Sequence, residues 1–110
     1  MNLASEHCIP NAPALDEADG AALLAQLPGW AVIDGKLQTS FAFKNYYQTM
    51  AFVNALAWVS HQQDHHPELV VSYKLCVVSY RTDSAGGALS RNDFICAARA
   101  SALAVQRAAP

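Results

Sequence analysis

The sequence has little charge and no long hydrophobic run, and each shortage excludes a class of protein. Only 15% of its 110 residues are charged, and the net charge is −2. The chain therefore lacks the surplus of positive charge with which proteins bind nucleic acids or anionic membranes. Asn54 and Ser60 interrupt the longest apolar run, which is too short to cross a membrane. We expect no nucleic-acid partner and no membrane partner.

The cysteines are too few and too scattered for a disulfide framework. Cys8, Cys76 and Cys96 show no C-x-x-C spacing, and an odd number of free thiols is typical of a reducing compartment. The first residues also lack the basic segment followed by an apolar segment that directs secretion. Together these features predict a cytoplasmic protein.

Apolar residues are abundant and make up 53% of the chain. A chain of 110 residues is long enough for one domain with a single core. So large an apolar fraction in so short a chain predicts that further surface is buried by self-association. Residues 1–14 contain Pro10 and Pro13 and have no periodic pattern, so we expect an irregular N-terminal arm there. Residues 15–110 are expected to form the single domain.

Hydrophobic periodicity and turn residues predict seven elements in that domain. We expect helices over residues 16–27, 45–65 and from 91 onward, and strands over residues 30–33, 36–43, 68–73 and 75–82. Asp34-Gly35 is a strong signal for a tight hairpin turn between the first two strands. The order α-β-β-α-β-β-α predicts an α+β fold, in which a four-stranded antiparallel sheet carries helices on one face.

The last helix is expected to begin after Ser90, which forms a capping box with Asp93. Its predicted buried stripe is Ile95, Ala98, Ala102 and Val105, and its predicted exposed residues are Arg99, Gln106 and Arg107.

Three of the four histidines fall within six positions, in the segment His61-Gln62-Gln63-Asp64-His65-His66. An imidazole gains or loses a proton near neutral pH, so a cluster of imidazoles is suited to proton transfer. Pro67 follows the cluster and disfavours helical geometry at His66, so the second helix is expected to end there. A helix end is a rigid place from which to present side chains.

Three interpretations of the cluster are open. Protonated imidazoles at a helix C-terminus are stabilised by the helix dipole, which is a purely structural role. His61 and His65 have the i, i+4 spacing of a two-histidine metal site, although Gln62 stands where the zinc protease motif has glutamate. A third metal ligand would have to come from Asp64, Asp83 or elsewhere. The last interpretation is acid–base catalysis on a small molecule, with one imidazole moving a proton and another orienting the substrate.

The residues from Asp64 onward resemble a known family. The similar positions are Asp64-His65-His66-Pro67-Glu68, Tyr73, Thr82, Gly86-Gly87, Leu89-Ser90 and Asp93-Phe94. This pattern resembles the pterin-4a-carbinolamine dehydratases, also called 4a-hydroxytetrahydrobiopterin dehydratases. The likeness also includes residues 23–30 (LLAQLPGW), 34–37 and 51–54. It covers nearly all of the chain from Leu15 to Ala104.

The resemblance implies a fold, an assembly and a reaction. The implied fold is a four-stranded antiparallel sheet backed by helices, assembled as a homodimer or homotetramer. The implied reaction is dehydration of a 4a-hydroxytetrahydropterin to a quinonoid dihydropterin, which recycles the pterin cofactor of aromatic amino acid hydroxylases. It requires no metal and no cofactor of its own. A general acid protonates the departing hydroxyl, and a base takes up a ring proton.

Carried over residue by residue, the resemblance implies roles for the histidine cluster. His65 matches the acid–base histidine of the family, and His66 matches the histidine that helps to bind and orient the substrate. The other motif residues, together with the histidine four positions before His65, are expected to assist substrate binding: His61, Asp64, Pro67 and Glu68. Tyr73 and Asp93 match pattern positions that are expected to be structural.

The third histidine of the family is absent. It follows the threonine that ends the fourth strand, but here Thr82 is followed by Asp83, and Ala88 makes the next loop one residue longer. In one account Asp83 is a catalytic residue whose carboxylate keeps a neighbouring histidine protonated. In the other, the protein is a catalytically impaired homologue that binds a pterin or a protein partner. An aspartate is ordinarily ionised at neutral pH and is a poor general acid, so we expect turnover below that of a three-histidine site.

Overall fold

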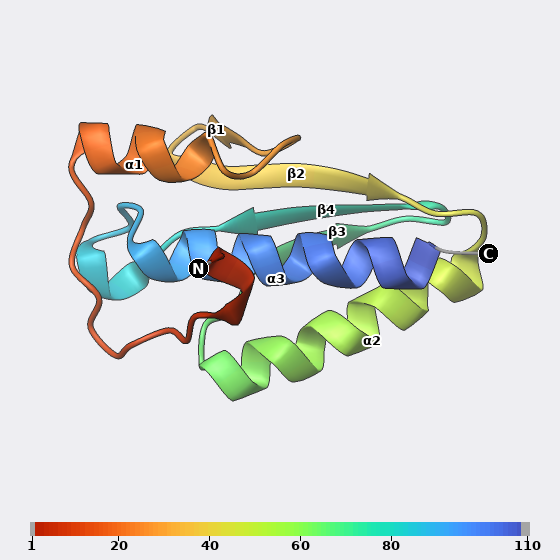
Figure 1. The fold of residues 1–110 in the computed structure, drawn as a ribbon. Helices are drawn as coiled ribbons and strands as arrows, with labels where there is room; N and C mark the ends of the chain where they lie inside the picture. Colours follow the sequence, from red (N-terminus) through yellow and green to blue (C-terminus); the bar gives the residue numbers. More distant parts are fainter. Residues whose placement is uncertain (1, 109–110) are drawn as a thin grey trace.

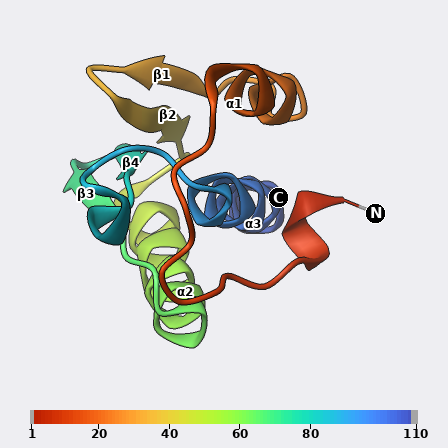
Figure 2. The ribbon, with the colours of Figure 1, turned by 90° about the vertical axis from the view of Figure 1, so that its left-hand side faces the viewer.

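The computed structural model describes residues 2–108, and side chains as far as residue 105. Four antiparallel strands form one sheet in the order β1-β2-β4-β3 (Figure 1). All three α-helices lie on the same face of this sheet (Figure 2). The predicted α+β fold and its order of helices and strands are confirmed. No helix in the described part of the chain is long and apolar enough to span a membrane.

The strands follow the predicted pattern with small changes at their ends. They are β1 (Ala31–Ile33), β2 (Lys36–Ala42), β3 (Glu68–Val71) and β4 (Leu75–Tyr80). Asp34 and Gly35 join β1 to β2 with φ angles of 52° and 78°. A type I′ turn requires positive φ at both of its central residues, which is why Asp-Gly marks it in the sequence. β3 pairs only with β4 and so forms one edge of the sheet.

The helices begin where their capping residues predict. They are α1 (Glu17–Leu24), α2 (Tyr46–Gln63) and α3 (Arg91–Ala108), with short 3-10 helices η1 (Leu3–Ser5) and η2 (Asp83–Ala85). The Asp16 side chain caps α1, and the Asn45 side chain caps α2 by accepting the Gln48 amide hydrogen at 2.8 Å. α1 ends three residues earlier than predicted because the chain tightens into i→i−3 turns before Pro28.

The core lies between the helices and the inner face of the sheet. Cys76, Val78 and Tyr80 alternate inward along β4, and each is at most 1% exposed. Phe52 and Leu56 of α2 are fully buried against them. α3 adds the small side chains of Ala97 and Ala100 to this core.

The predicted buried stripe of α3 is wrong in part. Ile95 is buried, but Ala102 and Val105 are exposed, and Ala97 and Ala100 lie in the core instead. Alanines occur on several faces of this helix, so their spacing does not identify the buried face. Arg99 does not point outward either: it is half-buried and donates to the carbonyl oxygen of Glu6. Gln106 and Arg107 lie outside the described side chains.

Residues 2–14 pack along α3, and apart from η1 they have little regular secondary structure. Leu3 and Ala12 are only 3% and 2% exposed. The Asn92 side chain accepts the Ile9 amide hydrogen at 3.0 Å and donates to the Ile9 carbonyl at 2.8 Å. The segment is thus fastened by polar side chains of α3 rather than by an apolar stripe of its own, and sequence periodicity does not detect such contacts. Figure 2 shows it crossing beside α2 and α3.

Candidate functional site

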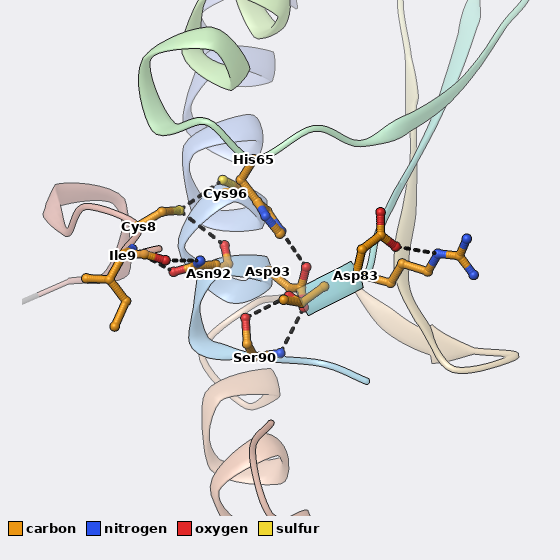
Figure 3. Close-up of polar contacts among 10 residues, drawn as sticks. Cys8, Ile9, His65, Asp83, Ser90, Asn92, Asp93 and Cys96 are labelled. Atoms are coloured by element: carbon orange, nitrogen blue, oxygen red, sulfur yellow. Dashed lines mark hydrogen bonds and ion pairs between the residues drawn. The ribbon is translucent and has the colours of Figure 1, made fainter. Parts of the chain in front are cut away.

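The site is built on the turn that ends α2. Asp64 follows the last helical residue with φ 50° and ψ 44°, a left-handed conformation that stops the helix. The next residue, His65, folds back with its amide bonded to the Ser60 carbonyl at 3.2 Å. Its ring nitrogen Nε2 meets Oδ1 of Asp93 at 2.6 Å (Figure 3). The side chains of His65 and Asp93 are 11% and 0% exposed, so this is a buried ion pair.

Asp93 uses its second oxygen to hold the surrounding chain. Oδ2 accepts the Thr82 hydroxyl at 2.7 Å and the Ser90 amide at 2.9 Å. Because Thr82 gives its only hydroxyl hydrogen to Asp93, Ser90 must donate the 2.7 Å bond between the two hydroxyls. One carboxylate therefore joins the end of α2, the segment after β4 and the start of α3.

The environment of His65 favours its protonated form. Burial by itself would lower the pKa of His65, but the hydrogen bond and the negative charge of Asp93 outweigh this effect, with smaller contributions from Cys8 and Asp83. The pKa of His65 is therefore raised above its ordinary value. The ring also stacks on Tyr80, with centroids 5.8 Å apart and planes 9° from parallel. These contacts fix the orientation of the imidazole as well as its charge.

His65 lies in the wall of a polar cavity of about 330 Å³. The wall is lined by Ile9, Pro10, Asn11, Asp64, His65, His66, Arg81, Thr82, Asp83, Ser84 and Asn92. This volume is at the small end of the range for ligand pockets and suits one compact molecule. The cavity thus brings together four of the residues predicted from the sequence: Asp64, His65, His66 and Asp83.

Asp83 lies at the rim of this cavity. Its side chain is 91% exposed, and its Oδ1 is 3.6 Å from Nε of Arg81 (Figure 3). The carboxylate that bonds to His65 is Asp93, so Asp83 acts on this histidine only through charge at longer range. His66 is exposed and lines the same cavity.

The other predicted binding residues are not in the cavity wall. His61 is exposed on α2 and lines a separate hollow. Its ring stacks on that of Trp58, with the ring centroids 5.7 Å apart. Glu68 forms an exposed ion pair with Lys36. Pro67 fixes the chain after His66 and does not line the cavity.

The two-histidine metal geometry is not formed. Because α2 ends at Gln63, His61 and His65 do not share a helix face, and they line different hollows. Within the described residues, no three His, Cys, Asp or Glu side chains are arranged to hold a metal ion.

The sequence predicted only one of the three side-chain hydrogen bonds of Asp93. The spacing from Ser90 predicted a capping box, and the Ser90 amide does bond to Asp93. The bond to His65 links residues 28 positions apart, and no local pattern signals it. The contribution of residues 9–11 to the cavity was missed for the same reason.

A family model now adds independent information. The model described as "Pterin 4 alpha carbinolamine dehydratase" matches residues 13–103. This chain belongs to that family. The resemblance drawn from the His-His-Pro motif is therefore confirmed.

Similar proteins support the assignment to the pterin carbinolamine dehydratase family. A Nitrosomonas eutropha protein named "Putative pterin-4-alpha-carbinolamine dehydratase" is 51% identical over 94% of this chain and 95% of its own length. A Stenotrophomonas maltophilia protein of the same name is 53% identical over 94% of this chain and 93% of its own length. The likeness thus spans whole proteins and is not limited to the motif.

Two solved structures share the fold. A "transcriptional coactivator/pterin dehydratase" from Brucella melitensis superposes with a TM-score of 0.79 at 28% identity, covering 83% of this chain and 98% of its own. A "pterin dehydratase-like protein" described as a RuBisCO assembly factor gives a TM-score of 0.58 at 29% identity, covering 68% and 86%. These two proteins are described with different roles, so one fold serves more than one function.

Proposed function

We propose that the protein dehydrates a 4a-hydroxytetrahydropterin to the quinonoid dihydropterin. The observation that carries this proposal is the buried His65–Asp93 pair in the wall of a compact polar cavity. Dehydration is assisted by a general acid that donates a proton to the departing hydroxyl group, and the raised pKa of His65 supports that role. Membership of the family supports the substrate class.

In this mechanism His65 is the general acid. Asp93 accepts the hydrogen on Nε2 and stabilises the imidazolium, so Nδ1–H is left to face the substrate. The Nδ1 proton moves to the 4a-hydroxyl oxygen while the carbon–oxygen bond breaks, and water leaves. A lone pair on the neighbouring ring nitrogen forms the new carbon–nitrogen double bond. Loss of one ring N–H proton to a base restores neutrality, and no metal or organic cofactor takes part.

The remaining cavity residues are proposed to bind and deprotonate the pterin. His66 is exposed beside the cavity and is proposed to orient the ring and to accept the ring proton. Asp83 is proposed to assist from the rim, as the residue at the third catalytic position. The carboxylates of Asp64 and Asp83 are acceptors for the amino and ring N–H groups of a pterin.

We also propose that copies of the chain associate as a homodimer or homotetramer. The edge strand β3 and its turn expose Val70 and Tyr73 at 67% and 65%. The outer face of α2 exposes Tyr47 and Trp58 at 82% and 61%. Exposed apolar surface of this kind and an unpaired sheet edge both favour association.

The proposed cellular role is recycling of the pterin cofactor of aromatic amino acid hydroxylases in the cytoplasm. The three free cysteines support a reducing compartment. Cell fractionation with an antibody to the chain tests the location. A pterin assay in cells that lack the gene tests the recycling.

A second candidate function is binding without turnover. The observation that favours it is Asp83, an exposed carboxylate at the position of the family's third histidine. The solved relative described as a RuBisCO assembly factor shares this fold, so the fold is compatible with an assembly role. In that case the cavity would bind a reduced pterin, or the surface would bind a protein, and no dehydration would follow.

The deciding experiment follows the decay of a 4a-hydroxytetrahydropterin produced by a hydroxylase. The wild-type chain should accelerate the decay, and His65→Ala should lose roughly 10²- to 10⁴-fold of that acceleration. His61→Ala is the matched control, because His61 lies on α2 outside the cavity and should retain activity. If the wild type binds a reduced pterin in calorimetry but does not accelerate the spontaneous decay, the protein binds the pterin without acting as an enzyme.

The substitution Asp83→His tests whether aspartate at the third catalytic position supports less activity than the histidine of the family. The side chain is almost fully exposed, so a histidine fits without disturbing the core. We expect the variant to turn over faster than the wild type. A lower rate would instead mean that the Asp83 carboxylate serves the reaction better than a histidine at this position.

A further inference from the structure

Two cysteines face each other next to the candidate site. Sγ of Cys8 lies 3.5 Å from Sγ of Cys96, although the residues are 88 positions apart (Figure 3). A disulfide has a sulfur–sulfur length near 2.05 Å, so the two sulfurs need to approach by only roughly 1.5 Å. Cys8 is half-buried and Cys96 is buried, and each is a free thiol.

The backbone around Cys8 is held in place on both sides. Its own amide donates to the Gln63 side chain at 2.8 Å. Ile9 is bonded to Asn92, one turn before Cys96 on α3, and the Glu6 carbonyl accepts from Arg99, almost one turn after it. The chain thus positions Cys8 directly over Cys96.

The two thiols differ in pKa and in exposure. The Cys96 hydrogen bond lowers the pKa of Cys8 against the opposing effect of burial, and the positive charges of His65 and Arg99 lower it further. The pKa of Cys96 is raised by its bond to Cys8 and by burial. Cys8 is also the more exposed of the two, so a peroxide reaches it first: Cys8 is the nucleophile, and Cys96 is the thiol that resolves its oxidised form. The third thiol, Cys76, is fully buried on β4, and burial raises its pKa.

We propose that Cys8 and Cys96 form a reversible disulfide when the protein meets a peroxide. The Cys8 thiolate attacks one peroxide oxygen, the oxygen–oxygen bond breaks, and a sulfenic acid and one water are produced. The Cys96 sulfur then attacks the Cys8 sulfur and displaces the hydroxyl group as a second water. In sum, two thiols and one hydrogen peroxide give one disulfide and two waters, and an external thiol reverses the change.

The disulfide would fasten one wall of the cavity. Ile9, Pro10 and Asn11 follow Cys8 immediately and line the cavity beside His65. A covalent bond from Cys8 to α3 ties the start of this segment to the helix that carries Asp93. The inference concerns the thiols themselves and does not depend on the proposed dehydratase activity.

The test treats the purified full-length chain with hydrogen peroxide and quenches free thiols with an alkylating reagent. Before alkylation, the expected product is a single chain lighter by two hydrogen atoms. Alkylation under denaturing conditions should then label one cysteine, Cys76, and non-reducing digestion should yield a Cys8–Cys96 linked peptide. Dithiothreitol added before the alkylating reagent should restore three free thiols. Because the bond closes a very long loop, the oxidised form should melt several degrees higher.

Three variants complete the test. Cys76→Ser is the matched control and should still form the disulfide. Cys8→Ser and Cys96→Ala should each abolish it, and circular dichroism checks that both remain folded. Disulfides between chains, oxidation of Cys8 to sulfinic acid without a link to Cys96, or no reaction at all would each overturn the proposal.

Discussion

Asp93 shows how a single residue connects stability to chemistry. It is a completely buried carboxylate, which is unfavourable unless its oxygens are satisfied. Thr82, the Ser90 amide and His65 together satisfy both oxygens. The same contacts that make the buried charge tolerable also orient the imidazole and favour its protonated form. Asp93 is therefore a positioning residue, and its effect on a reaction passes through His65.

Replacing Asp93 by asparagine should separate charge from shape. In Asp93→Asn the pKa of His65 should fall, because its main stabilising charge is gone. Stability should fall by about 3 kcal/mol, the usual cost of breaking a buried ion pair. Imidazole proton signals across a pH series and urea unfolding measure the two effects. Asp83→Asn is the control and should change both far less, because Asp83 is exposed; equal effects would contradict the assignment.

The raised pKa of His65 predicts how stability depends on pH. A histidine with a higher pKa in the folded state binds its proton more tightly there than in the unfolded chain. Its stabilisation is therefore complete below pH 6.5, the ordinary value, and is lost as pH rises through the raised folded-state pKa. The difference in free energy of unfolding between wild type and His65→Gln should shrink over that interval. If this difference in free energy of unfolding grew with pH, the pKa of His65 would be lowered rather than raised in the folded state.

At the scale of elements, the C-terminus of α2 decides which histidines enter the site. Asp64 adopts positive φ, and this single turn separates exposed His61 on the helix from half-buried His65 after it. A helix extended to residue 65 would have aligned the two rings on one face. The turn thus places His65 within bonding distance of Asp93.

Substitutions at Asp64 should reveal this constraint. Asp64→Gly should preserve the fold and stabilise it by up to about 1 kcal/mol, because glycine adopts positive φ without strain. Asp64→Val should destabilise by about 1–2 kcal/mol, because a β-branched side chain opposes that conformation. Urea unfolding measures both. If valine were tolerated as well as glycine, the turn would not be what holds His65 in place.

At the scale of the whole molecule, two surfaces within the described residues expose large apolar side chains and could take part in the proposed association. All three helices cover one face of the sheet, so the edge strand β3 and the outer side of α2 face outward (Figures 1 and 2). Val70 lies on the first surface and Trp58 on the second. Two separate surfaces can support a dimer through one and a tetramer through both.

Charging either surface should therefore reduce the size of the assembly. Val70→Lys should weaken association through the sheet edge, and Trp58→Lys should weaken association through α2. Sedimentation velocity of each variant against wild type measures the change. Ala22→Lys is the matched control, because it adds the same charge at an exposed position of α1 outside both surfaces. A wild type that sediments as a monomer would contradict the proposed association.

Short-range signals in the sequence account for the local structure. Asp34-Gly35 fixed a hairpin because both turn residues need positive φ, and Asn45 fixed the start of α2 because its side chain caps free amides. The alternation along β4 identified its buried side chains because neighbouring residues in a strand face opposite ways. The His-His-Pro motif led to the family. Each of these signals acts over a few residues and is therefore visible in a linear pattern.

Which distant groups meet depends on how the elements pack in the folded chain. His65 joins Asp93 from 28 residues away, and Cys8 meets Cys96 from 88 residues away. The N-terminal segment packs on α3 through the side chains of Asn92 and Arg99 rather than through any periodic pattern. Such contacts depend on how elements pack in three dimensions, and no spacing along the chain encodes them individually. The sequence indicated a histidine site, and the fold selected Asp93 as the partner of His65.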